Sequence, residues 1–471
     1  LTALSGKYPP ELVNRFFDTL SVQKGLSKIL IDFSTSSLQV FFGLLVLSFY
    51  HQAFILFGLI LIILIYILFR LLGPRGLKTS LDESTHKYKL AHWLEEVGRA
   101  MGTFKLAGKT NLPIEKTDGL LVGYLGARRK HFRILLIKYG GLVLFKVLVV
   151  TALLIIGGFL VINREMNIGQ FVASEIIIIM VMNAVEKVML SIDTVYDVLT
   201  SLEKIGQVTD IELEEDEGMP FNMNCELGER AIEVEVQNLK CFKKPCPNPP
   251  FLNLKIPAGQ KVFLTGRSGS GRSSLLNVIA AKEKPMDGTI HYNGFPIETI
   301  ELESLRSFIG DSLNDEDIFS GTLFENIGLG RPWATRDKVL EAIETFGLTD
   351  WYKTLPSGLQ TELLPQGEQL PDHVIKKIIL ARGIADAPGL LVLEDFLHNM
   401  PEKDKLEMIS TILGLKCTVV IAGNDALFAS MCDRVIAMEE GHIIADGSFR
   451  DVAKQSSVRE TLYPLTDAKS E

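Results

Sequence analysis

The residues best suited to chemistry lie in one glycine-rich turn, Thr265–Ser274, which reads TGRSGSGRSS. It differs by one residue from the phosphate-binding pattern G-x-x-x-x-G-K-[S/T], because Arg272 stands where lysine is expected. In such a turn, backbone N–H groups and the N-terminus of the next helix hold phosphate oxygens. Ser273 is also in a position to reach a magnesium ion. The predicted phosphate contacts are Gly266, Ser268, Gly269, Ser270, Gly271, Arg272, Ser273 and Ser274.

The segments around this turn predict the elements that position it. Lys261–Thr265 reads KVFLT and predicts a strand, and Ser273–Ala281 predicts a helix. Strand, turn and helix in this order favour phosphate binding, and a glycine-rich turn without a ligand remains the alternative. From about Leu227 onward, short apolar strands alternate with helices, which predicts an α/β domain.

The first two hundred residues carry the long apolar runs. Leu38–Gly73 is almost continuously apolar, with its main interruption at His51 and Gln52. One bilayer crossing needs about 20 apolar residues, so these runs favour membrane helices over a buried soluble bundle. The predicted helices cover residues 25–50, 53–72, 132–162 and 168–192.

Basic residues predict the orientation of these helices. The segment Arg70–Arg133 is rich in lysine and arginine, whereas the links at 51–52 and 163–167 carry one arginine at most. By the positive-inside tendency, the long segment is cytoplasmic and the short links are external. An acidic segment follows the last helix, at 206–227, and predicts a solvated linker.

Composition excludes several other functions. A net charge of −9 argues against nucleic-acid binding. The five cysteines form no CxxC pair, which indicates reduced thiols and neither a disulfide framework nor a zinc site. The first twenty residues lack the basic start and apolar centre of a signal peptide, consistent with a fragment of a longer chain.

Several stretches of the second half resemble the nucleotide-binding domain of ABC transporters. They are LRSFIG at 305–310, IFSGTLFENI at 318–327, ILARG at 379–383 and DRVIAMEEGHIIADG at 433–447. The first half is similar to exporters of the peptide- and toxin-secretion kind, whose coupling segments resemble residues 6–15 and 95–105.

The resemblance implies a fold and a domain order. The fold is an α-helical transmembrane domain, holding the last four of six exporter helices, followed by an α/β P-loop nucleotide-binding domain. Two spanning helices would then precede residue 1. The expected domains are the transmembrane domain with its cytoplasmic extensions (1–205), the acidic linker (206–227), the nucleotide-binding domain (228–456) and a C-terminal tail (457–471).

The resemblance also assigns roles around an ATP molecule with Mg²⁺. It implies that Phe242 stacks on adenine and that Glu394 supports the magnesium ion together with Ser273. Asn314 takes the place of the lid glutamine, another nucleotide and magnesium contact. Asp395 holds the general-base position, and Gly423 holds the position of the switch histidine.

The chain departs from the family pattern at many of these positions. Arginine at 272 is longer and forked, so it is not a conservative replacement for lysine. Glu394 and Asp395 stand in exchanged order, and Asp395 is shorter by one methylene; a displacement of about 1 Å can cost roughly a hundredfold in rate. Gly423 has no side chain to contact a phosphate. Asn314 is one carbon shorter than glutamine.

The signature loop of the family, leucine-serine-glycine-glycine-glutamine, aligns with residues 370–374, which read LPDHV. Asp372 would bring a negative charge towards the terminal phosphate bound by the partner subunit. In the family, each site combines the phosphate loop of one subunit with the signature loop of the other. This chain alters both contributions, so we expect poor hydrolysis in a homodimer and in a heterodimer.

These observations predict an ABC-exporter-type membrane protein with a degenerate ATP-binding domain. It would bind nucleotide at best, act as a pseudo-ATPase, and serve as a transporter subunit or a structural or regulatory partner. The alternative is an active ATP-driven exporter. The expected partners are the lipid bilayer and a second half-transporter, in a homodimer or heterodimer, with no nucleic acid. The expected location is the plasma (inner) membrane, with the nucleotide-binding domain in the cytoplasm.

Overall fold

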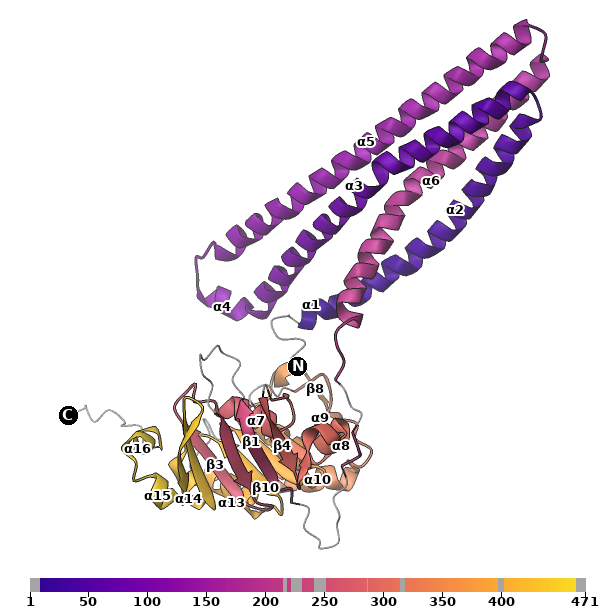
Figure 1. Cartoon of the computed structure of the whole chain (residues 1–471). Coiled ribbons are helices and arrows are strands. Elements are labelled where there is room, and N and C mark those ends of the chain that lie inside the picture. The colour runs from indigo at the N-terminus through magenta and orange to yellow at the C-terminus, as the bar shows by residue number, and fades with distance from the viewer. Residues whose placement is uncertain are drawn as a thin grey trace. The chain divides into compact units, whose positions relative to one another are not determined.

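The computed structural model describes residues 9–214, 218–221, 231–240, 251–285, 287–313, 318–396 and 402–462 (Figure 1). The chain divides into two compact units, a helical one within Ala3–Glu212 and an α/β one within Leu213–Glu471. Two predicted nucleotide contacts, Phe242 and Asn314, lie outside the described residues.

Long helices build the helical unit. Three of its described helical segments, Glu11–Ser48, Leu112–Ile162 and Ile168–Thr209, are long and apolar enough to cross a membrane, and Gln52–Ile67 is a shorter apolar stretch. These positions agree with the four apolar runs of the sequence. The helices are α1 (Pro9–Val13), α2 (Asp18–Ser48), α3 (Gln52–Arg99), α4 (Met101–Leu106), α5 (Leu112–Ile162) and α6 (Ile168–Thr209), with a 3-10 turn at Asn14–Phe17.

The long helices pair as α2 with α6 and α3 with α5, and they lie nearly parallel along much of their length (Figure 1). Glycines permit the close approach of α2 to α6. A Cβ atom added to Gly25 would lie 2.3 Å from a methyl group of Val198, and one added to Gly43 would lie 2.4 Å from a methyl group of Val181. Small residues are favoured where membrane helices pack, because they let the backbones approach.

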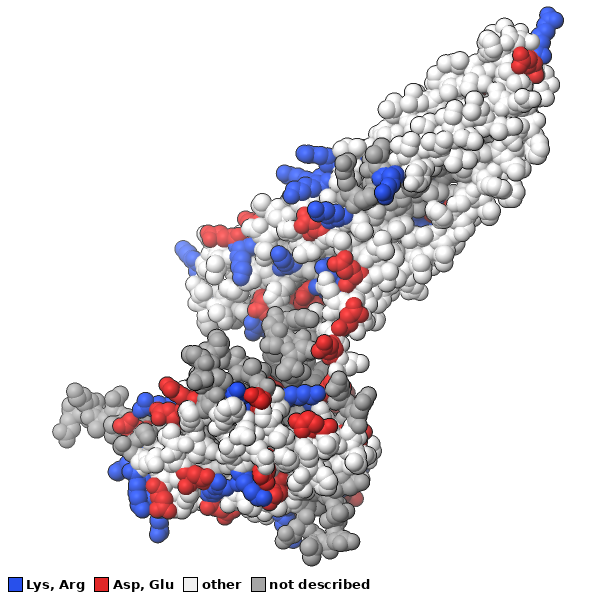
Figure 2. All heavy atoms as spheres, in the orientation of Figure 1, with Lys and Arg blue, Asp and Glu red and all other residues white. Residues whose placement is uncertain are grey.

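Charged side chains are distributed unevenly over the helical unit. Figure 2 shows one part of the unit almost free of lysine, arginine, aspartate and glutamate, and the part towards the α3–α4 end studded with them. Two lysines of α5 form ion pairs with α6. The Nζ of Lys138 lies 2.5 Å from Asp193, and the Nζ of Lys146 lies 3.1 Å from Glu186. An apolar band with paired charges beside it is the distribution expected of a membrane-spanning bundle.

The segment after α6, where a solvated linker is expected at 206–227, makes specific contacts at its described residues. α6 itself continues to Thr209, and Glu214 accepts two hydrogen bonds from the guanidinium of Arg306, at 2.6 and 2.8 Å. The backbone of Met219 pairs with Thr299 and Glu301, at 2.9 Å each. The sequence indicated only the acidity of this segment, and the docking depends on partners some ninety residues further along the chain.

The α/β unit contains a four-stranded antiparallel sheet, in the order β2-β1-β4-β5, and a six-stranded sheet, in the order β12-β11-β3-β10-β9-β6. A two-stranded pair, β7-β8, is separate. The strands are β1 (Val234–Lys240), β2 (Leu252–Ile256), β3 (Lys261–Gly266), β4 (Asp287–Tyr292), β5 (Phe295–Pro296), β6 (Ile309–Ser312), β7 (Gly321–Thr322), β8 (Glu362–Leu363), β9 (Leu390–Glu394), β10 (Thr418–Ala422), β11 (Arg434–Glu439) and β12 (His442–Gly447).

The described helices of this unit are α7 (Arg272–Ile279), α8 (Leu302–Ser307), α9 (Leu323–Gly328), α10 (Arg336–Thr345), α11 (Thr349–Lys353), α12 (Asp372–Ile384), α13 (Glu402–Gly414), α14 (Ala426–Met431), α15 (Phe449–Val452) and α16 (Ser456–Leu462). Helices α7, α8, α12, α15 and α16 pack against strands of the six-stranded sheet. The central strands β3, β9 and β10 are buried along their whole length, as apolar parallel strands covered on both faces should be.

The register of the parallel strands gathers the predicted site residues at one edge. β3, β10 and β9 are neighbours and run in the same direction, with Leu264 opposite Ala422 and Ala422 opposite Glu394. The turns that follow these strands therefore meet at the carboxyl ends, which is where open α/β sheets bind ligands.

Candidate functional site

The glycine-rich turn after β3 depends on glycine at three positions. Gly266, Gly269 and Gly271 have φ values of 152°, 84° and 99°, a region that other residues rarely adopt. A Cβ atom on Gly266 would also lie 2.2 Å from the carbonyl oxygen of Met438. The turn is anchored from outside by the N–H of Gly441, which donates to the carbonyl oxygen of Ser270 at 3.0 Å.

This turn fits a phosphate group. In α7, the N–H of Leu275 donates to the carbonyl oxygen of Gly271 at 3.0 Å, so the N–H groups of the first turn, residues 272–274, have no carbonyl partner within the helix. Beside them, Gly269 borders open space: a Cβ atom added there would meet nothing within 4 Å. Backbone donors that face open space are what a phosphate oxygen requires.

Arg272 extends from the turn to the end of β10. Its Nη1 donates to the carbonyl oxygen of Gly423 at 3.1 Å and to Oδ1 of Asn424 at 2.9 Å. Burial lowers the pKa of Arg272, while Asp395 and Glu394 raise it. The guanidinium keeps its charge, because arginine is not deprotonated in proteins. The structure thus places a fixed cation beside the turn.

The two predicted magnesium ligands that the structure describes lie together. The hydroxyl of Ser273 donates to Oε1 of Glu394, a buried carboxylate at the end of β9. A serine hydroxyl and a carboxylate are the oxygen ligands that Mg²⁺ takes beside substrate phosphates. These residues could hold a magnesium ion that neutralises phosphate charge.

Asp395 differs from Glu394 in its surroundings. It is exposed, with a φ of 41°, and its N–H donates to the carbonyl oxygen of Ala422 at 3.0 Å. Gly423 is buried nearby, and a Cβ atom added there would lie 3.3 Å from Oδ1 of Asp395. Gly423 and the acid pair therefore meet at one place, whereas the sequence indicated only that each follows a strand.

Asn424 is a site residue that sequence reasoning missed. Its Oδ1 accepts hydrogen bonds from Arg272 and, at 3.2 Å, from Oγ1 of Thr265. The partners are 152 and 159 positions away along the chain. The available signal was its place directly after Gly423, the position that the resemblance aligns with the switch histidine.

The segment aligned with the signature loop precedes and begins α12. Pro371 is the residue before the helix, and Asp372 is its first residue and is exposed. A carboxylate in the first turn of a helix interacts favourably with the helix dipole. This interaction is a structural reason for an aspartate at position 372, apart from any contact with a nucleotide. Val374 is buried in the core of the unit, 3% exposed.

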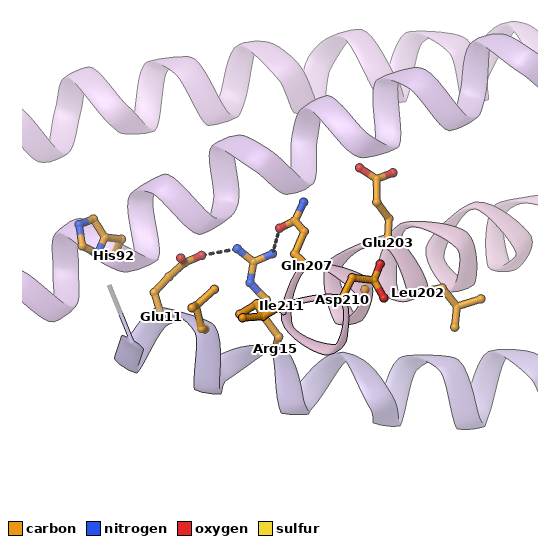
Figure 3. Close-up of a pocket in the computed structure, with 10 residues that line it drawn as sticks. Glu11, Arg15, His92, Leu202, Glu203, Gln207, Asp210 and Ile211 are labelled. Carbon is orange, nitrogen blue, oxygen red and sulfur yellow. Dashed lines mark hydrogen bonds and ion pairs between the residues drawn. The ribbon is translucent and has the colours of Figure 1, made fainter. Parts of the chain in front are cut away.

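A second concave region lies within the helical unit. Its cavity of about 840 Å³ is lined partly by Glu11, Arg15, His92 and Gln207. Figure 3 shows Arg15 between Glu11 and Gln207; its Nη2 lies 2.5 Å from Glu11, and its Nη1 donates to Gln207 at 3.1 Å. The guanidinium also lies 4.0 Å above the ring of Tyr88. Arg15 thus joins α1, α3 and α6, which is a structural role.

Comparisons with known proteins agree with this architecture. A family model described as the ABC transporter transmembrane region matches residues 5–185, and one described as ABC transporter matches residues 251–396. A solved structure, a bacterial Atm1-family ABC exporter with ATP bound, is similar with a TM-score of 0.85 and 17% identity; the match covers 98% of this chain and 81% of that one. At that identity the likeness shows the fold.

Curated relatives are similar over part of their length. A protein of Staphylococcus aureus (strain NCTC 8325 / PS 47), named "Putative multidrug export ATP-binding/permease protein", is 28% identical over 242 residues. The match covers 51% of this chain and 42% of that protein. A protein of the same name from the bovine strain RF122 / ET3-1 matches with the same identity and coverage. The chain therefore matches less than half the length of these relatives.

Proposed function

Since the chain carries both the transmembrane region and the ABC domain of the ABC transporters and has the fold of an ABC exporter, we propose that it is a subunit of an ATP-driven exporter. The observation that carries this proposal is the glycine turn at the carboxyl end of β3, with open space beside Gly269 and helical N–H groups that have no carbonyl partner within the helix. The names of the curated relatives, which describe multidrug export, also support it.

In this proposal, ATP supplies the energy and the residues of the chain hold it. The backbone of Gly269–Ser274 surrounds the phosphates, and Arg272 supplies a cation beside them. Ser273 and Glu394 hold a magnesium ion, and Phe242 contacts the base. We propose further that the chain lies in the inner membrane as a dimer of half-transporters, with its α/β unit in the cytoplasm. The relatives' names favour this active exporter over the degenerate ATPase predicted from the sequence.

A second candidate function follows from the substituted residues. Gly423 has no side chain, Asp395 is shorter than the usual general base, and Asp372 stands within the segment aligned with the signature loop. If these positions have the roles that the resemblance implies, the chain binds ATP and hydrolyses it slowly. The subunit would then regulate or support a partner that supplies the turnover. The exchanged order of Glu394 and Asp395 is the observation that favours this candidate.

Turnover in a lipid bilayer separates the two candidates. The chain is purified, reconstituted into liposomes, and its release of phosphate from ATP with Mg²⁺ is measured. Steady turnover of about 1 s⁻¹ or more, in the range usual for enzymes, supports the active exporter. ATP binding with turnover at least about a hundredfold lower supports the second candidate. Absence of both binding and turnover contradicts both.

A further inference from the structure

Arg272 and Asn424 form a connection between the phosphate turn and the end of β10. β3 and β10 are neighbouring parallel strands, so the turn after β3 and the turn after β10 lie side by side. Arg272 is the first residue of α7, and its Nη1 crosses to the carbonyl oxygen of Gly423 and to Oδ1 of Asn424.

Asn424 organises two donors with one oxygen atom. Its Oδ1 accepts from Arg272 at 2.9 Å and from Oγ1 of Thr265 at 3.2 Å. Thr265 is fully buried at the end of β3, so its hydroxyl is a fixed point. Asn424 thereby ties the flexible guanidinium of Arg272 to the rigid end of the central strand.

The connection leaves part of the guanidinium available. Both bonds use Nη1, and among the described residues neither Nε nor Nη2 of Arg272 has a hydrogen-bond partner that the structure records. Guanidinium groups bind phosphate through a fork of donors, which a lysine ammonium lacks. The free side of Arg272 is therefore suited to a phosphate oxygen.

The position of the connection indicates which phosphate it meets. Ser273 and Glu394, the residues proposed to hold magnesium, lie on the β9 and α7 side of the turn, and β10 is directly beside β9. Ser273 and Glu394 would hold a magnesium ion beside the outer phosphates of a nucleoside triphosphate. A cation held at the end of β10 would then be on the side of the terminal phosphate.

We propose that Arg272 recognises the terminal phosphate of the nucleotide from the β10 side, and that Asn424 is the positioning residue that holds it there. The pair supplies side-chain donors at the strand end where Gly423 has none. This inference rests on the proposed nucleotide binding. It predicts that the site distinguishes ATP from ADP through two residues whose contributions are coupled.

The test is a double-mutant cycle on the purified full chain, with equilibrium affinities for ATP and ADP measured in the presence of Mg²⁺. Asn424→Ala should weaken ATP binding about tenfold, the usual size for a hydrogen bond to a charged group, and ADP binding less than twofold. Arg272→Ala should have a similar effect. In the double variant, the effect of Asn424→Ala should disappear, because the residue it positions is gone.

Asn253→Ala is the matched control, because it also removes an asparagine oxygen that accepts a hydrogen bond, from the N–H of Asn238 at 2.7 Å, but in the four-stranded sheet, which carries none of the proposed phosphate contacts. It should leave the ratio of ATP to ADP affinity unchanged. A variant that merely damages the fold weakens both nucleotides alike, so the ratio separates positioning from folding. Equal losses for ATP and ADP, or additive effects in the double variant, overturn the inference while leaving nucleotide binding intact. No binding by the wild-type chain overturns the proposed function as well.

Discussion

Single residues at the carboxyl ends of β3, β9 and β10 define the candidate site. The predicted phosphate turn and the acid pair were visible in the sequence, because each is a local pattern directly after a strand. The bonds that join them were not visible. Ser273 reaches Glu394 and Arg272 reaches Asn424 across 121 and 152 positions of the chain. Contacts of that range depend on the strand order, which a single sequence does not determine.

If the second candidate function is correct and the substituted residues limit hydrolysis, restoring the residues of the family pattern should raise ATP turnover. The variant combines Arg272→Lys, Asp395→Glu and Gly423→His with serine and glycines in place of residues 371–373. ATP turnover should rise by at least about tenfold over the wild type, because a correctly placed base alone is worth about a hundredfold. Phosphate release by the purified variant measures it.

The matched control for this repair carries the same changes with Asp395→Gln, which has the length of glutamate and cannot accept a proton. It should show no gain. If the control and the repaired variant gain equally, Asp395 does not hold the general-base position.

At the scale of secondary-structure elements, two features organise the structure: the pairing of the long helices and the contacts of the segment after α6. Apolar length predicted the spanning helices. The pairing of α2 with α6 depends on glycines whose role in close packing can be recognised only when the partner helix is known. The docking of Glu214 was hidden for the same reason, because acidity alone predicts solvation.

Close packing predicts that leucine destabilises the helical unit at one glycine position and is tolerated at another. Gly43→Leu should destabilise the helical unit, because even its Cβ would overlap Val181. Overpacking of this kind typically costs about 1–3 kcal/mol. Gly140→Leu on α5 is the control, since a Cβ added at Gly140 meets nothing within 4 Å. Thermal unfolding in detergent measures both, and equal midpoints for the two variants would contradict the α2–α6 packing.

The ion pair of Glu214 with Arg306 predicts that the segment 213–221 opens more often when the pair is removed. The hydrogen bond from Arg306 holds the pKa of Glu214 below its usual value, so the pair is formed at neutral pH and is lost as the pH falls through that lowered pKa. Glu214→Gln should speed proteolytic cleavage within 213–221 by a few-fold at pH 7, since an exposed pair is worth at most about 1 kcal/mol. The neighbouring Glu212→Gln should cleave at the wild-type rate. No difference between the two variants would show that the pair does not hold the segment.

For the chain as a whole, the apolar runs and the distribution of basic residues imply an orientation in the membrane. The described helices reverse at Asn163–Asn167 and again between α4 and α5. The positive-inside tendency assigns these two reversals to opposite sides. Composition alone is enough to predict this orientation, because the orientation depends on which segments carry basic residues and not on which residues contact one another.

Cysteine labelling tests this orientation. In a chain without its five native cysteines, Asn163→Cys should react with a membrane-impermeant thiol reagent added to intact cells. Lys109→Cys should react only after the membrane is opened. The reverse pattern would place the α/β unit outside the cell and would contradict the proposed export function.

The central claim is that the turn after β3 still binds ATP. The most direct test is equilibrium binding of ATP with Mg²⁺ to the purified full chain in lipid, compared with Arg272→Ala. We predict saturable, magnesium-dependent binding by the wild type that is weakened at least about tenfold in the variant, because the lost donor is a charged one. Absence of saturable binding, or binding that Arg272→Ala leaves unchanged, would contradict the claim.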